Sequence, residues 1–169
     1  MTSFQHFKRL LKHALMPHWV ALRPFSPEVL AEIESAVRRS ERLHDGELRF
    51  ALEGSLDVRP VWHGQSPRKR AEELFASLRV WDTEHNSGVL IYLQMVDRRI
   101  EIIADRGTAR KVTQATWDEI CRKMERAFVA GRFRDGALEA IADITALLAK
   151  HFPPSTENPD ELPDRPVVL

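Results

Sequence analysis

Two apolar runs of strand length, residues 89–96 and 99–104, are separated only by the charged pair Asp97-Arg98. Such runs predict two strands that are covered on both faces and joined as an antiparallel hairpin. With Asp97-Arg98 as a two-residue turn, Leu93 would pair with Ile102. The turn lacks the Asn-Gly or Asp-Gly that two-residue hairpins prefer, so a four-residue loop is an equal alternative.

Apolar positions at helical spacing predict five helices, at about residues 4–15, 28–43, 67–78, 116–130 and 135–151, and alternation predicts a strand at residues 47–53. Ser66-Pro67 is a typical helix start. Thr116 and Glu119 form a capping box, and Asp135 can cap the last helix. This order of elements predicts the α/β class: a three-layer α/β/α sandwich with a mixed sheet of about four strands, including a C-terminal antiparallel hairpin.

Charge and apolar content divide the chain into three regions. Residues 1–23 form an amphipathic basic helix with Lys8, Arg9, Lys12 and Arg23 and no acid, residues 24–152 form the domain, and residues 153–169 form an acidic, Pro-rich tail. We expect the first helix to pack on the domain; the alternative is docking of its apolar stripe on a protein or membrane surface. The tail is expected to be disordered or loosely attached.

Composition excludes several classes of protein. The formal net charge is zero, so no global field attracts the chain to nucleic acid. A single cysteine excludes an internal disulfide and fits a reducing compartment. No apolar stretch approaches the length of a membrane span, and the N-terminus lacks a continuous signal-peptide core, so we expect a cytoplasmic protein. Glycine-rich phosphate loops, G-x-S-x-G elbows and H-E-x-x-H motifs are missing from the sequence.

Three polar clusters lie near the predicted strand ends and contain the candidate functional residues. Oxygen ligands for a hard cation could come from Asp82, Glu84, Asn86 and Glu47, and His44 would shift the preference toward a transition metal. An ion held by these side chains would be a divalent cation such as calcium, magnesium or zinc, and the sequence leaves the cofactor open. Asp105 and Arg106 form the third cluster and are the candidate catalytic residues. The alternative is that these side chains only cap helices and close turns.

The runs G-V-L-I-Y-L and D-R-R-I-E-I-I-A-D-R-G, preceded by A-E-E-L-F-A-S-L, resemble the TPM domain family over roughly residues 27–152. The segments S-E-R-L-H-D-G-E-L-R-F and W-D-T-E-H-N-S-G are similar to a soluble bacterial subgroup. The resemblance implies a mixed sheet between helices, and members of this family include acid phosphatases and proteins that bind calcium near acidic loops. Asn86 and Gly88 match the family's Asn-Gly entry to the core strand, and residues 105–107 match its second loop. The family's usual membrane anchor has no counterpart in this sequence, and His44 and His85 stand where family loops are acidic or neutral.

Two functions follow. The favoured one is an accessory binding module of the cytosol, with a divalent ion ordering the acidic loops and an unknown protein partner that could be membrane-associated. The alternative is a metal-assisted, acid-phosphatase-like phosphomonoesterase. In that enzyme Asp82, Glu84, His44 and Glu47 would hold the ion, and Arg106 would bind phosphate.

Overall fold

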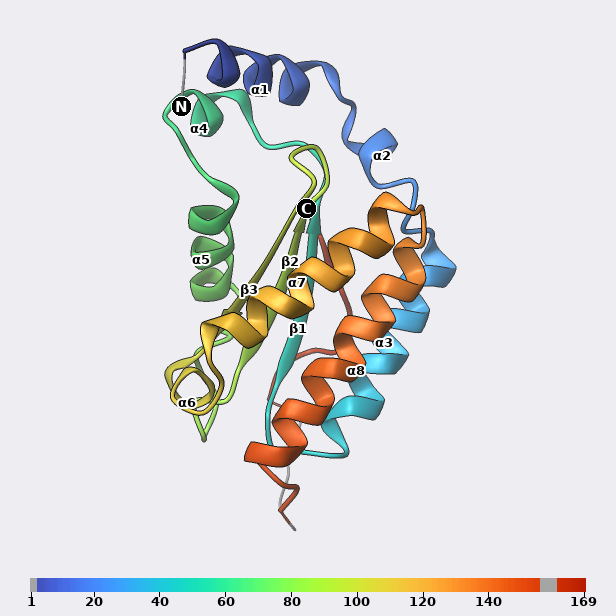
Figure 1. Cartoon of the computed structure of the whole chain (residues 1–169), viewed down its shortest axis with the longest axis vertical. Helices are drawn as coiled ribbons and strands as arrows, with labels where there is room; N and C mark the ends of the chain where they lie inside the picture. The colour runs from blue at the N-terminus through green and yellow to red at the C-terminus, as the bar shows by residue number, and fades with distance from the viewer. Residues whose placement is uncertain (1–2, 156–160) are drawn as a thin grey trace.

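A computed structural model describes residues 3–155 and 161–169 (Figure 1). Its sheet has the order β3-β2-β1-β4, and β1 is parallel to β2 and β4 while β2 is antiparallel to β3. The strands are β1 Leu48–Glu53, β2 Val89–Gln94, β3 Arg99–Ala104 and β4 Val167–Val168. The predicted mixed sheet with an antiparallel hairpin is confirmed.

Helices cover both faces of the sheet, so the predicted three-layer sandwich is also confirmed. One face is covered by α3, α7 and α8, and the other by α5 and the C-terminal segment (Figure 1). The described residues form α1 Ser3–Leu15, α2 His18–Ala21, α3 Pro27–Glu41, α4 Val58–Trp62, α5 Pro67–Ser77, α6 Arg106–Ala109, α7 Gln114–Val129 and α8 Phe133–His151.

Alternate residues of β1 enter two separate cores. Phe50 and its neighbours at the same face pack in the large core with the inner sides of α3, α7 and α8, whereas Ala51 belongs to the smaller core with Leu74 and Leu162. Full burial of a large apolar side chain stabilises the fold by about 1.5–3 kcal/mol. Because a one-residue slip would exchange the two faces, this packing fixes the register of the central strands.

The hairpin uses the four-residue connection rather than the two-residue turn. Leu93 pairs with Ile100, not with Ile102, and residues 95–98 form the loop. Arg98 adopts φ 53°, and the Asp97 amide donates to Gln94 Oε1 at 2.8 Å. The register is shifted by two residues, an even number, so every side chain keeps its predicted face.

The helix start predicted at Ser66-Pro67 is confirmed, and α3 begins at Pro27, one residue before its expected start. The side chains of Ser26 and Ser66 accept backbone N–H groups at the starts of α3 and α5. The other two starts were wrong: α7 begins at Gln114 and α8 at Phe133. The Phe133 ring lies 4.9 Å from that of Phe128, centroid to centroid, so tertiary packing sets the start of α8 before Asp135 is reached.

The C-terminal segment is attached to the sheet, which corrects the expectation of a loose tail. β4 adds to the otherwise open edge of β1, and the Leu169 amide donates to Leu52 O at 2.9 Å. Leu162 is buried on the smaller core. Glu157 and Asp160, two acids of the predicted tail, lie outside the described residues.

Candidate functional site

The three predicted polar clusters lie at one edge of the sheet. β1 and β2 run parallel and begin at this edge, and β3 ends there. Backbone hydrogen bonds join the loops: the Asp105 amide donates to Gly88 O at 2.8 Å, and the Gly107 amide donates to Asn86 O at 3.0 Å. We call this the amino-terminal edge.

Asn86, Asp105 and Arg106 come together at the amino-terminal edge. Arg106 Nε donates to Asn86 Oδ1 at 3.0 Å, and the Asp105 carboxylate accepts the Arg106 amide at 2.7 Å as the N-cap of α6. With His85, Gly107 and Arg110, Asn86 and Arg106 line an open hollow of about 430 Å³. The arrangement could hold an anion, but Asp105 acts as a cap and is not among the lining residues.

The other predicted ligands face different partners. Asp82 is half exposed and pairs with Arg79 at 2.5 Å. The exposed Glu84 uses its amide to donate to the Glu161 carboxylate at 3.0 Å. His44 is fully buried, with Nε2 2.8 Å from Ser40 Oγ.

Glu47 is also directed away from a common centre, since its carboxylate accepts backbone N–H groups of Glu161 and Leu162. Burial lowers the pKa of His44, so the ring is neutral at pH 7. Within residues 3–155 and 161–169, no group of three or more His, Cys, Asp or Glu side chains is arranged to hold a metal ion. The local polar density that suggested a metal site is instead distributed over caps, ion pairs and attachment of the C-terminal segment.

A buried carboxyl cluster fastens this segment to the sheet. Glu41, Glu47, Arg49 and Asp164 are all less than 9 % exposed, and Arg38 Nε donates to Asp164 Oδ2 at 2.8 Å. Burial, a hydrogen bond with Asp164 and the nearby charge of Glu47 raise the pKa of Glu41 to about 10. Glu41 is therefore protonated at neutral pH, and its polar neighbours in the sequence give no indication of this.

α1 lies at the opposite end of the molecule (Figure 1), and its apolar side faces solvent. Phe4, Phe7 and Leu15 are 64 %, 60 % and 70 % exposed, whereas Leu10 and His13 are buried against the domain. The helix is packed on the domain, as expected. Its orientation differs from the ordinary amphipathic arrangement, in which the apolar stripe faces the core.

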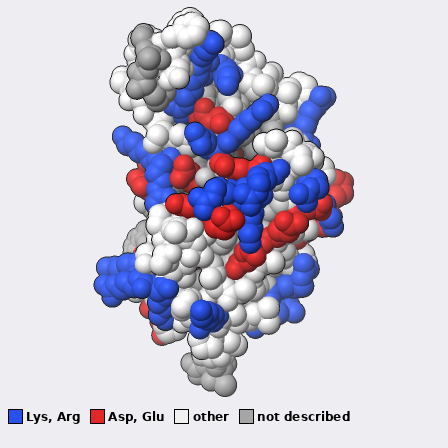
Figure 2. Space-filling view, in the orientation of Figure 1, with Lys and Arg blue, Asp and Glu red and all other residues white. Residues whose placement is uncertain are grey.

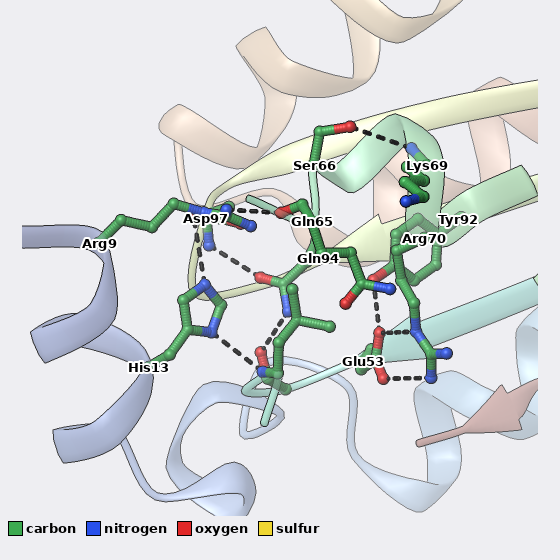
Figure 3. A network of polar contacts seen from close by, with 12 residues as sticks. Arg9, His13, Glu53, Gln65, Ser66, Lys69, Arg70, Tyr92, Gln94 and Asp97 are labelled. Atoms are coloured by element: carbon green, nitrogen blue, oxygen red, sulfur yellow. Dashed lines mark hydrogen bonds and ion pairs between the residues drawn. The ribbon is translucent and has the colours of Figure 1, made fainter. Parts of the chain in front are cut away.

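Polar side chains hold α1 in this orientation (Figure 3). Arg9 forms two hydrogen bonds of 3.0 Å and one of 2.8 Å with the Asp97 carboxylate, and Nη1 donates to Gln65 O at 2.6 Å. His13 Nδ1 accepts the Leu56 amide at 3.0 Å, and His13 Nε2 lies 3.2 Å from Asp97 Oδ1. We call Arg9, His13 and Asp97 the polar anchor.

Charge strengthens this anchor. Burial alone would raise the pKa of Asp97, but His13 and Arg9 outweigh it and lower the pKa to about 2. Behind the anchor, Gln94 Nε2 donates to Gly54 O at 2.9 Å, and the Tyr92 hydroxyl donates to Glu53 Oε2 at 2.5 Å (Figure 3). The hairpin loop, the end of β1 and α1 are thereby joined. Sequence analysis missed this anchor; Arg9 and His13, four residues apart on one helix face, were its only local sign.

Apolar side chains are concentrated on the exposed side of α1 and on the short helices beside it. In this part of the molecule lie eight of the twelve exposed large hydrophobic residues that the described chain contains. Figure 2 shows a largely white and blue surface at this end, with most acidic side chains of that view nearer the middle. We define the docking face as Phe4, Phe7, Leu11, Leu15, Met16 and Trp19, with Lys8 and Lys12 between them.

The fold and these surfaces define a small α/β sandwich domain with an exposed apolar helix face at one end. The chain belongs to the TPM domain family, whose model matches residues 23–147. α1 and α2, which carry the docking face, precede the residues that the family model matches. Among the described residues, no helix has both the length and the apolar character needed to cross a bilayer.

Solved structures agree with this assignment. The BA42 protein of the psychrophilic bacterium Bizionia argentinensis is 28 % identical, with a TM-score of 0.75 over 85 % of this chain and 94 % of that one. The N-terminal domain of a protein from P. gingivalis is 16 % identical, with a TM-score of 0.63 over 77 % and 82 % of the two chains, and shows the fold alone. A comparison with curated protein sequences gave no match.

Proposed function

We propose that the protein is a non-catalytic accessory module of the cytoplasm that attaches to anionic membrane surfaces through the docking face. The orientation of α1 is the observation that carries this proposal. The aromatic and aliphatic side chains of α1 point outward, while Arg9 and His13 face the domain. The helix is therefore already oriented to insert its apolar side chains into a membrane. The TPM domain behind α1 serves as a rigid support for this helix.

The docking face has the chemistry of an interfacial helix. Phe4, Phe7 and Trp19 supply aromatic rings, and residues 1–23 contain no acid. Insertion of Phe and Leu side chains would recover about 1.5–3 kcal/mol for each that becomes fully buried. Lys8 and Lys12 would each add about 1 kcal/mol near an anionic surface. Because the polar anchor already fixes α1, docking does not require the helix to fold.

Flotation with lipid vesicles tests the proposal. We expect binding to vesicles of phosphatidylcholine with phosphatidylglycerol, weaker binding to phosphatidylcholine alone, and a decrease in binding as salt is raised. F7E with L11E should abolish binding, because it places two charges in the apolar face. K8E with K12E should remove the preference for anionic vesicles.

Val129→Glu is the matched control for these variants. Val129 is an apolar side chain with 88 % exposure that lies on α7, outside the docking face. Its change adds one negative charge, against two in F7E/L11E, and leaves α1 unaltered. Equal binding of wild type and F7E/L11E would contradict attachment through this face, and so would an equal loss of binding in V129E. If wild type binds neither kind of vesicle, the membrane is not the partner.

Phosphomonoesterase activity is the second candidate, and the hollow beside Arg106 favours it. Arg106 and Arg110 offer two cations to a phosphate, and Asn86 orients the first of them. Divalent ions would be added singly in assays with p-nitrophenyl phosphate. Turnover that disappears in R106A while the unfolding temperature is unchanged would support this activity; equal rates in R106A and wild type would exclude the Arg106 hollow as its site.

A further inference from the structure

A cavity in the described part of the chain lies at the end opposite the predicted clusters. It measures about 580 Å³ and is bounded by α2, the end of the hairpin and the connection between α7 and α8. This is the carboxyl-terminal end of the parallel strands β1 and β2, where ligands bind in open α/β sheets. Its volume lies within the range of about 300–1,000 Å³ that is typical of small-molecule sites.

The floor of the cavity is apolar. Leu93 and Ile100 come from the paired strands, and Phe128 and Phe133 come from the ends of the two helices behind them. The rings of Phe128 and Phe133 form one cluster with Phe25, with centroids 4.9–6.1 Å apart. Packing of these rings against one another gives the floor a fixed shape. Because the floor is apolar, it suits a hydrocarbon chain.

The rim carries unbalanced positive charge. Arg23, Arg98 and Arg99 line the cavity, against the single acid Glu125. Throughout the described ranges, none of these three arginines forms an ion pair with a carboxylate. Arg98 also has φ 53°, an unusual conformation for a side chain of its size, at the tip of the loop that borders the cavity.

We infer that this cavity is a binding site for an anionic amphiphile: a single hydrocarbon chain that ends in a carboxylate or a phosphate. The chain would occupy the aromatic floor, and the head group would meet Arg98 and Arg99 at the rim, where guanidinium groups favour bidentate contact with either oxyanion. On α2, Val20 and Ala21 form the cavity wall beside Trp19 of the docking face. The inference rests on the cavity alone and does not require membrane attachment.

Titration of the ¹⁵N-labelled full chain with dodecanoate below its micellar concentration tests the inference. We expect saturable shifts of amides from the residues around the cavity. Dodecyl phosphate should shift the same amides, and the ratio of the two affinities identifies the preferred head group. Dodecanol and inorganic phosphate, which each lack one half of the ligand, should bind at least tenfold more weakly.

Two variants separate the rim from the floor. R99E should weaken dodecanoate binding about tenfold, whereas R42E, which reverses an exposed arginine at the end of α3, should not change it. A21W should fill the cavity from α2 and prevent binding without disturbing the core. The F7E/L11E variant should still bind dodecanoate, so failure of membrane attachment and failure of the cavity site are distinguishable.

Several results would overturn the inference. These are no saturable binding of either anionic amphiphile, equal affinity for dodecanol and dodecanoate, equal weakening by R42E and R99E, or undiminished binding by A21W. Circular dichroism and the unfolding temperature of each variant show whether its fold is intact.

Discussion

Gly88 shows how closely the backbone is packed where β2 begins. A Cβ atom at this position would lie 1.9 Å from Val80 O, a contact with backbone that no side-chain movement relieves. A similar limit applies to Gly107, whose added Cβ would lie 2.5 Å from both His85 O and Asn86 O. These glycines hold the loops of the amino-terminal edge together, which is a structural role for residues that first attracted notice as parts of polar motifs.

Gly88→Ala should therefore lower the free energy of unfolding by about 3 kcal/mol or more, at the upper end of the cost of overpacking. Urea denaturation measures the change. Gly46→Ala provides a comparison, because its Cβ would meet side-chain atoms and no backbone: the terminal methyl groups of Leu148 at 3.1 and 3.2 Å, and His44 Nδ1 at 3.5 Å. A loss in G88A no greater than that in G46A would show that the backbone at Gly88 relaxes freely.

Glu41 links stability to pH at the same scale. Its pKa is about 10 in the folded protein against an ordinary value near 4.5, so the folded state binds the proton more tightly. The stabilisation that this proton gives is complete below pH 4.5 and is lost as pH rises toward 10. E41Q keeps a hydrogen-bond donor and acceptor but cannot ionise. Its free energy of unfolding should therefore exceed that of wild type by roughly 1–3 kcal/mol at pH 8. Urea unfolding at pH 5 and pH 8 checks this, and a parallel decline in both proteins would assign the pH dependence to other groups.

At the scale of elements, α1 is held by polar contacts and not by its apolar stripe. Asp97 joins it to the hairpin loop through Arg9 and His13. Because these contacts lower the pKa of Asp97 to about 2, their contribution is present above about pH 3.8 and is lost as pH falls toward 2. The helix is thus a separately attached unit whose detachment would leave both cores intact.

Asp97→Asn should release α1 while the domain stays folded. Hydrogen exchange of the α1 amides should accelerate at least tenfold, with little change in β1 and β2, because asparagine keeps the shape but removes the charge that Arg9 faces. Asp82→Asn is the control, since Asp82 also pairs with an arginine but lies on the exposed surface. Unchanged α1 exchange in D97N would show that Leu10 and the Leu56 contact suffice to hold the helix.

The C-terminal segment is the second element whose attachment depends on distant residues. Leu162 is buried in the smaller core, and its amide donates to Glu47 Oε2 at 3.1 Å. Leu162→Ala should cost about 2–4 kcal/mol in urea denaturation. Val168→Ala, at a position that is nearly half exposed, should cost less than 1 kcal/mol. Equal effects would mean that strand pairing, and not the buried leucine, attaches the segment.

For the whole molecule, sequence patterns predicted what neighbouring residues decide. The two faces of the hairpin, the helix start at Ser66-Pro67 and the layer order all depend on short spacing along the chain. Contacts between residues far apart in the sequence were missed. Arg9 donates to Asp97, which is 88 residues away, and Glu47 accepts the amide of Leu162, which is 115 residues away. The predicted ligands share an edge but not a centre, because each side chain found a partner that local polarity does not reveal. The cavity was missed for the same reason, since three segments far apart in the sequence bound it.

Under the proposed function, only one end of the sheet contacts the membrane. One experiment with vesicles should therefore distinguish the two ends. The amino-terminal edge carries caps, buried carboxyl groups, the C-terminal segment and the hollow beside Arg106, whereas the opposite end carries the docking face. Addition of anionic vesicles should slow hydrogen exchange in α1 and α2 several-fold and leave the loops at residues 82–88 and 105–107 unchanged. The same measurement on F7E/L11E should show no slowing. Protection that appears instead at the amino-terminal edge would reverse the proposed orientation and make Arg106 and Arg110 the membrane contacts.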